Sequence, residues 1–303
     1  MKRFLVQWGE QYLYHPTLVQ KILSVALLPI SFLYCLGGSI RYHRTKPKNY
    51  GIPVVSVGNL IIGGSGKTPV ASELARYFKK PAIVLRGYGR ESRGMVVVKD
   101  RDILCDTKMS GDEAMVYATT LPHAVVIVSE IRERAIAEAV SMGCDVVLLD
   151  DGYGKHGIEK LDIIIDVPTP NPFCLPSGAY REVLWRGKEA IVIREGEHFR
   201  RHVRIHNETG KMVLVTAIAR PERLDPYLPD VIDKIYFEDH HFFTQRELEE
   251  ILAQSGADSL LVTQKDFVKI ASFKLNLSVM ELSTDLDQTL IRTVKEYVDA
   301  AQN

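Results

Sequence analysis

The stretch VVSVGNLIIGGSGKTPVASELARYF (residues 54–78) decides the fold of this chain. It runs from apolar, β-branched residues through a glycine-rich turn into a helix that we expect to begin near Lys67. Strand, glycine-rich turn and helix in this order are the structural context of a phosphate-binding loop. The turn departs from the GxxxxGK[ST] pattern at one position, because Ile61 stands where the first glycine is expected.

The residues of this turn suit a nucleoside triphosphate and Mg²⁺. Glycines let the turn expose successive backbone N–H groups to phosphate oxygens, and the helix N-terminus adds the positive end of its dipole. A lysine here reaches the β- and γ-phosphates, and a following threonine binds Mg²⁺. The alternative is an ordinary glycine-rich turn before a helix, and the flanking elements argue against it. The predicted nucleotide-binding residues are Gly63, Gly64, Ser65, Gly66, Lys67 and Thr68.

The fold predicted around this turn is α/β, with a P-loop NTPase-like, doubly wound and mostly parallel sheet. Continuously apolar runs suit strands that are buried on both faces. Segments with apolar residues at helical spacing separate several of them, which predicts right-handed βαβ crossovers. The apolar runs are residues 52–57, 81–86, 123–129, 145–150 and 161–166.

The chain divides into three predicted parts. A Pro- and Gly-rich stretch at 168–190 reads as a long loop, EAIVIRE (189–195) resembles a strand, and the residues after it read as a polar junction. The α/β pattern resumes at residue 211. We therefore predict an N-terminal membrane-associating helical segment (1–48), a P-loop core (49–205), which the family resemblance described below makes a kinase core, and a smaller α/β lobe (206–303).

The N-terminal part contains nineteen residues without a charge (22–40), followed by a basic stretch at 41–48. The run is marginal in length for a membrane-spanning helix. A signal peptide is disfavoured, because no A-x-A cleavage site follows. A buried core helix stays open as an alternative. We favour a helix on or partly in the bilayer, with its basic flank against anionic headgroups.

Composition excludes some classes of protein. The chain has 38 basic and 38 acidic residues, which argues against a general nucleic-acid binder. The four cysteines show neither CxxC nor metal-ligand spacing, and we interpret them as reduced thiols in the cytosol. The nine histidines form no zinc signature, so no structural metal is expected.

A pair of aspartates follows one of the predicted strands. Asp150 and Asp151 lie in DVVLLDDGYG, where the carboxyl end of a parallel strand borders the ligand site of an open α/β sheet. An aspartate beside a P-loop is the usual partner for Mg²⁺ or its waters, although one of the two could cap the following turn. We predict both as metal ligands.

A regulatory NTPase or metallochaperone-type GTPase is the alternative from another class. TQKD (263–266) resembles the N/T-K-x-D motif that reads a guanine base, without an asparagine at its first position. A GTPase does not need an apolar N-terminal helix with a basic flank. Nucleotide hydrolysis that requires no acceptor substrate would favour this alternative.

Eight blocks occur in an order that resembles the tetraacyldisaccharide 4'-kinase family. These blocks are VGNLIIGGSGKTP (57–69), RGYGR (86–90), GDEA (111–114), DDGY (150–153), LPSGAYRE (175–182), PERL (221–224), DHHFFT (239–244) and VTQKD (262–266). The resemblance covers nearly the whole chain, and the family also lacks the first P-loop glycine.

The resemblance implies that ATP, with Mg²⁺, phosphorylates the 4'-hydroxyl of an acylated glucosamine disaccharide 1-phosphate in lipid A biosynthesis. It also implies a peripheral or monotopic protein on the cytoplasmic face of the bacterial inner membrane. The expected partners are this lipid substrate and the membrane surface, with no nucleic acid and no obligate protein partner.

The resemblance also implies roles for single residues. The GDE block carries the family's catalytic aspartate, which is Asp112 here, although Ser110 or Asp112 could simply cap a helix. Glu113 is predicted as a further metal ligand. A histidine from the second lobe pairs with the aspartate in the family, and spacing does not decide between His240 and His241.

Two arginines complete the predicted site. Arg181 is implied near the transferred phosphate, and Arg86 is predicted to bind substrate or to structure the cleft. The chain departs from the family after DDG, where its Gln is absent and its His is displaced to His156. It departs again where GIGNPERF becomes AIARPERL. No role is assigned to Lys265 or Asp266.

Overall fold

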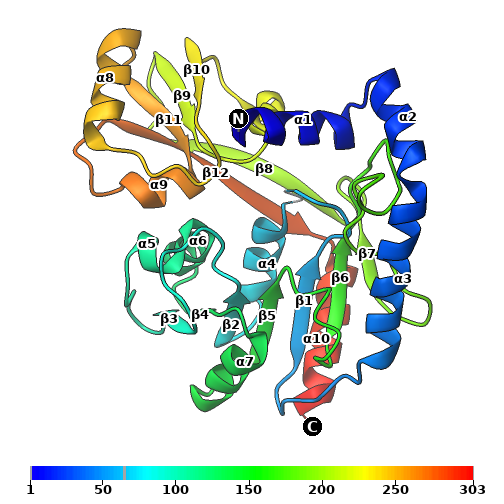
Figure 1. Cartoon of the computed structure of the whole chain (residues 1–303). Coiled ribbons are helices and arrows are strands. Elements are labelled where there is room, and N and C mark those ends of the chain that lie inside the picture. The colour runs from blue at the N-terminus through cyan, green and yellow to red at the C-terminus, as the bar shows by residue number, and fades with distance from the viewer. Residues whose placement is uncertain (1, 64–65, 303) are drawn as a thin grey trace.

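The structure, a computed structural model, describes residues 2–63 and 66–302, with side chains from residue 8 onward. A seven-stranded sheet in the order β3-β4-β2-β5-β1-β6-β7 forms its larger part (Figure 1). All neighbours are parallel except β3 and β4, which are antiparallel. The strands are β1 Val54–Gly58, β2 Pro81–Leu85, β3 Val96–Lys99, β4 Val125–Val128, β5 Val146–Asp150, β6 Leu161–Ile165 and β7 Ile191–Ile193.

Helices cover both faces of this sheet, so the predicted doubly wound α/β fold is confirmed. On one face, apolar residues of α4 (Lys67–Ala75), α6 (Asp112–Thr120) and α10 (Gln288–Gln302) pack in a single core with strand residues. On the other face, α7 (Arg132–Ser141) packs on β1, β2, β4 and β5. A short helix, α5 (Thr107–Ser110), precedes α6.

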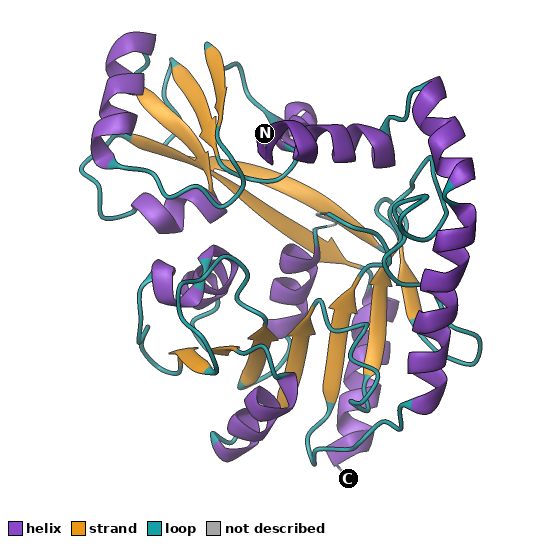
Figure 2. Cartoon of the chain, viewed as in Figure 1, coloured by secondary structure: helices purple, strands orange, loops and turns teal. Residues whose placement is uncertain are grey.

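A second sheet of five strands has the order β10-β9-β11-β12-β8, and only the β12–β8 pair is antiparallel. Figure 2 shows two long strands of this sheet reaching back toward the first sheet. Its elements are β8 Phe199–His206, β9 Met212–Thr216, β10 Asp233–Tyr236, β11 Ser259–Thr263, β12 Leu277–Leu286, η1 Pro221–Tyr227, α8 Gln245–Ser255 and α9 Gln264–Ile270.

The chain crosses between the two sheets more than once. β8 belongs to the second sheet but begins at Phe199, before the predicted start of the smaller lobe at residue 206. The chain then returns to the first sheet in α10, where Leu290 and Val294 pack in its core. The residues that we read as a polar junction are in fact β8, whose side chains alternate between the two sides of an edge strand. The division of the chain at residues 48 and 205 stays a prediction.

The N-terminal segment forms α1 (Lys2–Tyr14), α2 (Leu18–Ala26) and α3 (Leu28–Arg44). Pro29 lies in the first turn of α3, and the axes of α2 and α3 differ by 55°. In the described part of the chain, only these two helices taken together have the length and apolarity that a membrane span requires.

The exposed faces of α2 and α3 are apolar, whereas polar residues point inward. Ser24 and Ser31 are buried and donate hydrogen bonds to Ser177 at 2.7 Å. The outward residues include Leu18, Val19, Ile22, Val25, Ile30, Phe32 and Leu33, each more than half exposed. This arrangement contradicts the alternative of a buried core helix.

The cysteine prediction is corrected at one pair. Cys35 of α3 and Cys174 of the loop after β6 form a disulfide, with Cα atoms 6.3 Å apart, whereas Cys105 and Cys144 are free. The contacts of α3 with the Ser177 segment bring the two cysteines together across 139 residues of sequence. Spacing along the chain therefore gave no indication of the pair.

Candidate active site

The glycine-rich turn delivers Lys67 to the carboxyl edge of the first sheet. Gly66 has a φ of 74°, a left-handed conformation that glycine adopts without strain, and α4 begins at the next residue. Lys67 Nζ donates to Asn59 Oδ1 at 3.3 Å and lies 3.7 Å from Asp151 Oδ1. Ile61, the residue in place of glycine, is buried against Tyr14. The predicted ligands Gly64 and Ser65 lie outside the described residues.

Two aspartates meet this lysine where β5 ends. Asp151 has a φ of 57°, and the Arg181 guanidinium donates to both of its carboxylate oxygens, at 3.0 and 2.6 Å. Asp150 is buried, and its Oδ2 accepts a hydrogen bond from the Tyr117 hydroxyl at 2.9 Å. The structure thus brings together Lys67, both aspartates and Arg181.

The two carboxyl groups have opposite pKa shifts. Burial, and then the negative charge of Glu113, raises the pKa of Asp150 to about 7. Burial also acts to raise the pKa of Asp151, but Lys67 and the Arg181 hydrogen bond outweigh it and hold that pKa below its usual range. The negative charge of Asp151 is therefore balanced by Lys67 and Arg181, whereas the carboxylate form of Asp150 lacks a comparable cation partner.

The same edge fits a Mg²⁺ ion. Asp150 Oδ1 is buried and accepts no hydrogen bond from the residues that the structure describes, and Thr68 lies beside the Tyr117 hydroxyl. Within those residues no group of three His, Cys, Asp or Glu side chains could hold a metal. Mg²⁺ typically binds one or two carboxylates together with substrate phosphates and waters. Asp150 with Thr68 meets that requirement.

Asp112 of α6 and His240, which follows β10, are in contact although they belong to different parts of the fold. Asp112 is the first residue of α6 and 2% exposed, and it accepts a hydrogen bond from His240 Nδ1 at 2.9 Å. His241 points elsewhere, to Glu247 at 3.1 Å. The N-cap of α6 is Gly111, so neither capping alternative holds.

Lysines surround this aspartate, and sequence reasoning missed their part. Lys265 Nζ lies 3.9 Å from Asp112 Oδ2 and 3.5 Å from Glu113 Oε1, and the buried Lys269 lies 4.0 Å from Asp112 Oδ2. Burial acts to raise the pKa of Asp112, but the His240 hydrogen bond and the charge of Lys265 outweigh it, so the pKa is lowered. Asp112 is therefore ionised at neutral pH.

Asp266 has a structural role at the end of β9. Its carboxylate accepts hydrogen bonds from Thr216 and Thr263 and from the backbone N–H of Ala217. Lys269 Nζ lies 2.9 Å from Asp266 Oδ1, which fixes the ammonium that faces Asp112. The aspartate of the TQKD segment therefore connects α9 to the end of β9 by hydrogen bonds. Its carboxylate oxygens have no further acceptor site with which to bind a guanine base.

Two further arginines, Arg86 and Arg132, follow the ends of β2 and β4. Arg86 follows β2 and is exposed, and within residues 2–63 and 66–302 it forms no ion pair. Arg132, which sequence reasoning missed, is buried at the start of α7, and its charge acts on Asp150 and Asp151. A lone arginine between an acidic and an apolar residue gives no sequence signal that could have singled it out.

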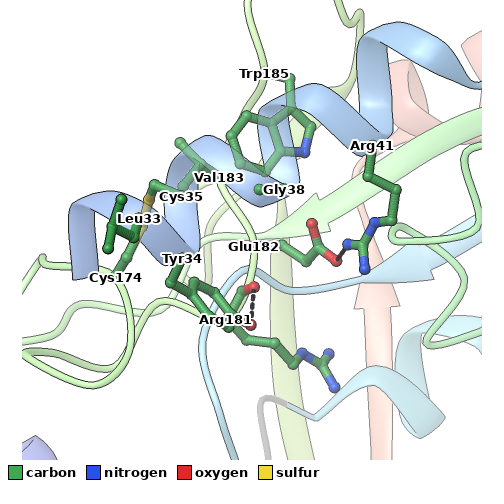
Figure 3. A pocket seen from close by; sticks show the side chains of 11 residues that line it. Leu33, Tyr34, Cys35, Gly38, Arg41, Cys174, Arg181, Glu182, Val183 and Trp185 are labelled. Atoms are coloured by element: carbon green, nitrogen blue, oxygen red, sulfur yellow. Dashed lines mark hydrogen bonds and ion pairs between the residues drawn. A yellow bond between two sulfur atoms is a disulfide. The ribbon is translucent and has the colours of Figure 1, made fainter. Parts of the chain in front are cut away.

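A cavity of about 340 Å³ opens between α3 and the segment that carries Arg181 (Figure 3). The Tyr34 hydroxyl donates to the Arg181 carbonyl oxygen at 3.0 Å, and Arg41 forms an ion pair with Glu182 at 2.8 Å. The other lining residues include Leu33, Cys35, Gly38, Cys174, Val183 and Trp185. The cavity connects the apolar N-terminal helices with the charged cluster.

Comparison with known proteins agrees with this arrangement. A family model described as tetraacyldisaccharide-1-P 4'-kinase (LpxK) matches residues 23–209 and 194–299. The chain belongs to this family. A tetraacyldisaccharide 4'-kinase of Helicobacter pylori (strain J99) is 44% identical, over 95% of this chain and 94% of the relative. One of Aliarcobacter butzleri is 40% identical, over 99% of each.

A solved structure supports the fold. A crystal structure of LpxK from Aquifex aeolicus in complex with ATP has a TM-score of 0.71. It is 23% identical to this family member and covers 93% of this chain and 100% of its own. The arrangement of the two sheets described above is thus that of the LpxK fold.

Proposed function

We propose that the protein is an ATP-dependent kinase of lipid A biosynthesis. It transfers the γ-phosphate of ATP to the 4'-hydroxyl of a tetraacylated glucosamine disaccharide 1-phosphate, which forms lipid IVA. Family membership supports the reaction, and the LpxK of Aquifex aeolicus is in complex with ATP. The observation that carries the proposal is the meeting of Lys67, Asp151 and Arg181 beside the buried Asp150.

In this proposal, Asp112 accepts the proton of the attacking hydroxyl. Its low pKa keeps it ionised, and the Nδ1–H of His240 orients the carboxylate. Lys67 and Arg181 offset the charge on the phosphoryl oxygens during transfer. Both cations now hold Asp151, so they exchange a carboxylate for phosphate oxygens when the nucleotide binds.

Mg²⁺ supplies charge neutralisation between the phosphate groups when it is bound. Asp150 and Thr68 would hold it, and Asp151 and Glu113 are further candidates once their present cations, Arg181 and Lys265, release them. The residues of this chain thereby supply one or two carboxylates and a hydroxyl, which is the donor set that a nucleotide-bound Mg²⁺ requires.

The outer face of α2 and α3 is proposed to contact the cytoplasmic surface of the inner membrane. Exposed apolar residues form that face, and basic residues follow it at the end of α3. We expect Phe32→Glu/Leu33→Glu to reduce sedimentation with anionic vesicles several-fold. Ile232→Glu, at a half-exposed residue outside α1–α3, is the control. Equal sedimentation of both variants would show that another surface binds lipid.

The reaction is tested by incubation with labelled ATP, Mg²⁺ and a lipid A precursor that lacks the 4'-phosphate. Label appearing in the lipid supports the proposal, and Lys67→Ala should abolish it. A GTPase makes the opposite prediction, namely hydrolysis that is independent of the lipid and prefers GTP. The buried, fully bonded Asp266 in TQKD argues against that alternative.

A further inference from the structure

Arginines of the second sheet face the glycine-rich turn. Arg201 is the third residue of β8, and Arg220 directly precedes η1. A Cβ built on Gly66 would lie 2.8 Å from Arg201 Cζ, so this guanidinium lies against the turn at the start of α4. A Cβ built on Gly63 would lie 4.0 Å from Arg220 Nη1. Two guanidinium groups therefore approach the turn from the second sheet.

The N-terminal helix α1 fixes the position of Arg220. The guanidinium carbon lies 3.9 Å from the centroid of the Tyr14 ring, in cation–π contact, and the Tyr14 hydroxyl donates to the carbonyl oxygen of Ile62. The Arg220 side chain is only 12% exposed. Tyr14 thus contacts both Arg220 and the backbone next to the glycine-rich turn, and it holds the arginine close to that turn.

The two arginines and their carboxylate partners lie close to the N-terminus of α4. A helix N-terminus carries a partial positive charge, so it favours an anion and disfavours a cation beside it. Burial, and then the charges of Arg220 and Arg201, lowers the pKa of the neighbouring Arg223. Glu195 lies 3.1 Å from Arg201, and Glu222 lies 3.5 Å from Arg220. Lys67 adds a further cation, which lies 3.7 Å from Asp151, so a phosphate group that enters here competes with carboxylates for these cations.

We propose that Arg201 and Arg220 bind the polyphosphate of the nucleotide held by the glycine-rich turn. The inference rests on the proposed function and extends it, since neither arginine belongs to the phosphate-binding motif. Planar guanidinium groups form paired, charge-assisted hydrogen bonds with phosphate oxygens. Because β8 is an edge strand of the second sheet whose Phe199 packs in the core of the first sheet, the same contact ties nucleotide binding to the position of the second sheet.

The test is the affinity of the full-length protein for ATP and for adenosine, with Mg²⁺ and without any lipid acceptor. Arg201→Gln and Arg220→Gln should each weaken ATP binding about tenfold or more, because a charge-assisted hydrogen bond is typically worth about 1.5–3 kcal/mol. Adenosine binding should change less than about twofold. Arg200→Gln is the matched control, since Arg200 directly precedes Arg201 in β8 and is exposed on the other face of the strand.

Arg201→Lys covers the case in which the glutamine variant does not fold. It keeps the charge and loses the planar fork, so we expect an intermediate loss of ATP affinity. Wild-type ATP affinity in Arg201→Gln and Arg220→Gln, or equal losses for ATP and adenosine, would overturn the inference. The labelled-lipid assay judges the proposed function separately. Arginine-dependent ATP binding without lipid phosphorylation would leave this inference standing and remove the function.

Discussion

The contact between Asp112 and His240 makes a quantitative prediction for a double-mutant cycle. Asp112→Asn removes the proposed proton acceptor but preserves the shape of the side chain. Loss of a general base typically lowers kcat by about 10²–10⁴-fold, which corresponds to about 2.7–5.4 kcal/mol in the barrier. The carboxylate is 2% exposed, so bulk water does not easily replace it.

His240→Ala should cost less than loss of the base. It removes one charge-assisted hydrogen bond of 2.9 Å, typically worth about 1.5–3 kcal/mol, so kcat should fall about 10- to 150-fold. Lys265 and Lys269 remain within 4.0 Å of the carboxylate and keep it ionised. Once the base is absent, the histidine has nothing to orient. The double variant should therefore be no slower than Asp112→Asn alone.

The assay is steady-state transfer of labelled phosphate from ATP to the lipid acceptor, with all variants at saturating substrate. The cycle should give a coupling energy of about 1.5–3 kcal/mol. His241→Ala is the matched control, because this neighbouring histidine contacts Glu247, and its kcat should change less than about threefold. Additive effects of Asp112→Asn and His240→Ala would refute the reasoning.

Three further predictions concern the P-loop lysine, a buried histidine and the cysteines. Lys67→Ala should lower kcat at least about 10³-fold with little change in Tm, since the ammonium contacts only polar atoms at the edge of the site. Burial, followed by the charge of Lys188, lowers the pKa of His156 in the folded protein to about 3. As the pH falls below 6.5, the imidazole therefore becomes protonated in the unfolded state while it stays neutral in the folded state. This difference lowers the free energy of unfolding by about 2 kcal/mol at pH 5 and has no effect well above pH 6.5. In urea unfolding, His156→Gln should lose less stability than the wild type between these two pH values. In denaturant without reductant, a thiol reagent should titrate two cysteines per chain and four after reduction; four from the start would contradict the disulfide.

The first sheet could be predicted because its strands are buried on both faces. A run such as residues 145–150 is continuously apolar, and the structure places β5 at Val146–Asp150. The helix after the glycine-rich turn likewise begins at Lys67, where the pattern indicated it. The parallel order of the strands also placed Asp151, directly after β5, at the carboxyl edge beside Lys67. These features depend on local pattern and topology alone.

The remaining features depend on contacts between distant segments. β8 alternates polar and apolar residues as an edge strand, and its many charges concealed it. Spacing did not distinguish His240 from His241, because the choice depends on a turn in which His240 has a φ of 62°. The two lysines near Asp112 come from α9, about 150 residues along the chain. Their role becomes visible only when α9 packs against α6.

The division of the site between the two sheets gives the second sheet a chemical function. Asp112 stands on α6 of the first sheet, whereas its histidine and both of its lysines come from the second. A movement of the second sheet that displaced His240 by a few ångströms would leave the buried Asp112 carboxylate without its hydrogen-bond donor. The loss of such a bond typically costs about 1–3 kcal/mol. If Arg201 on β8 binds polyphosphate, the nucleotide favours the same relative position of the two sheets that orients the base. Nucleotide binding would then further stabilise the arrangement in which His240 already donates to Asp112, and loss of Arg201 would weaken that coupling.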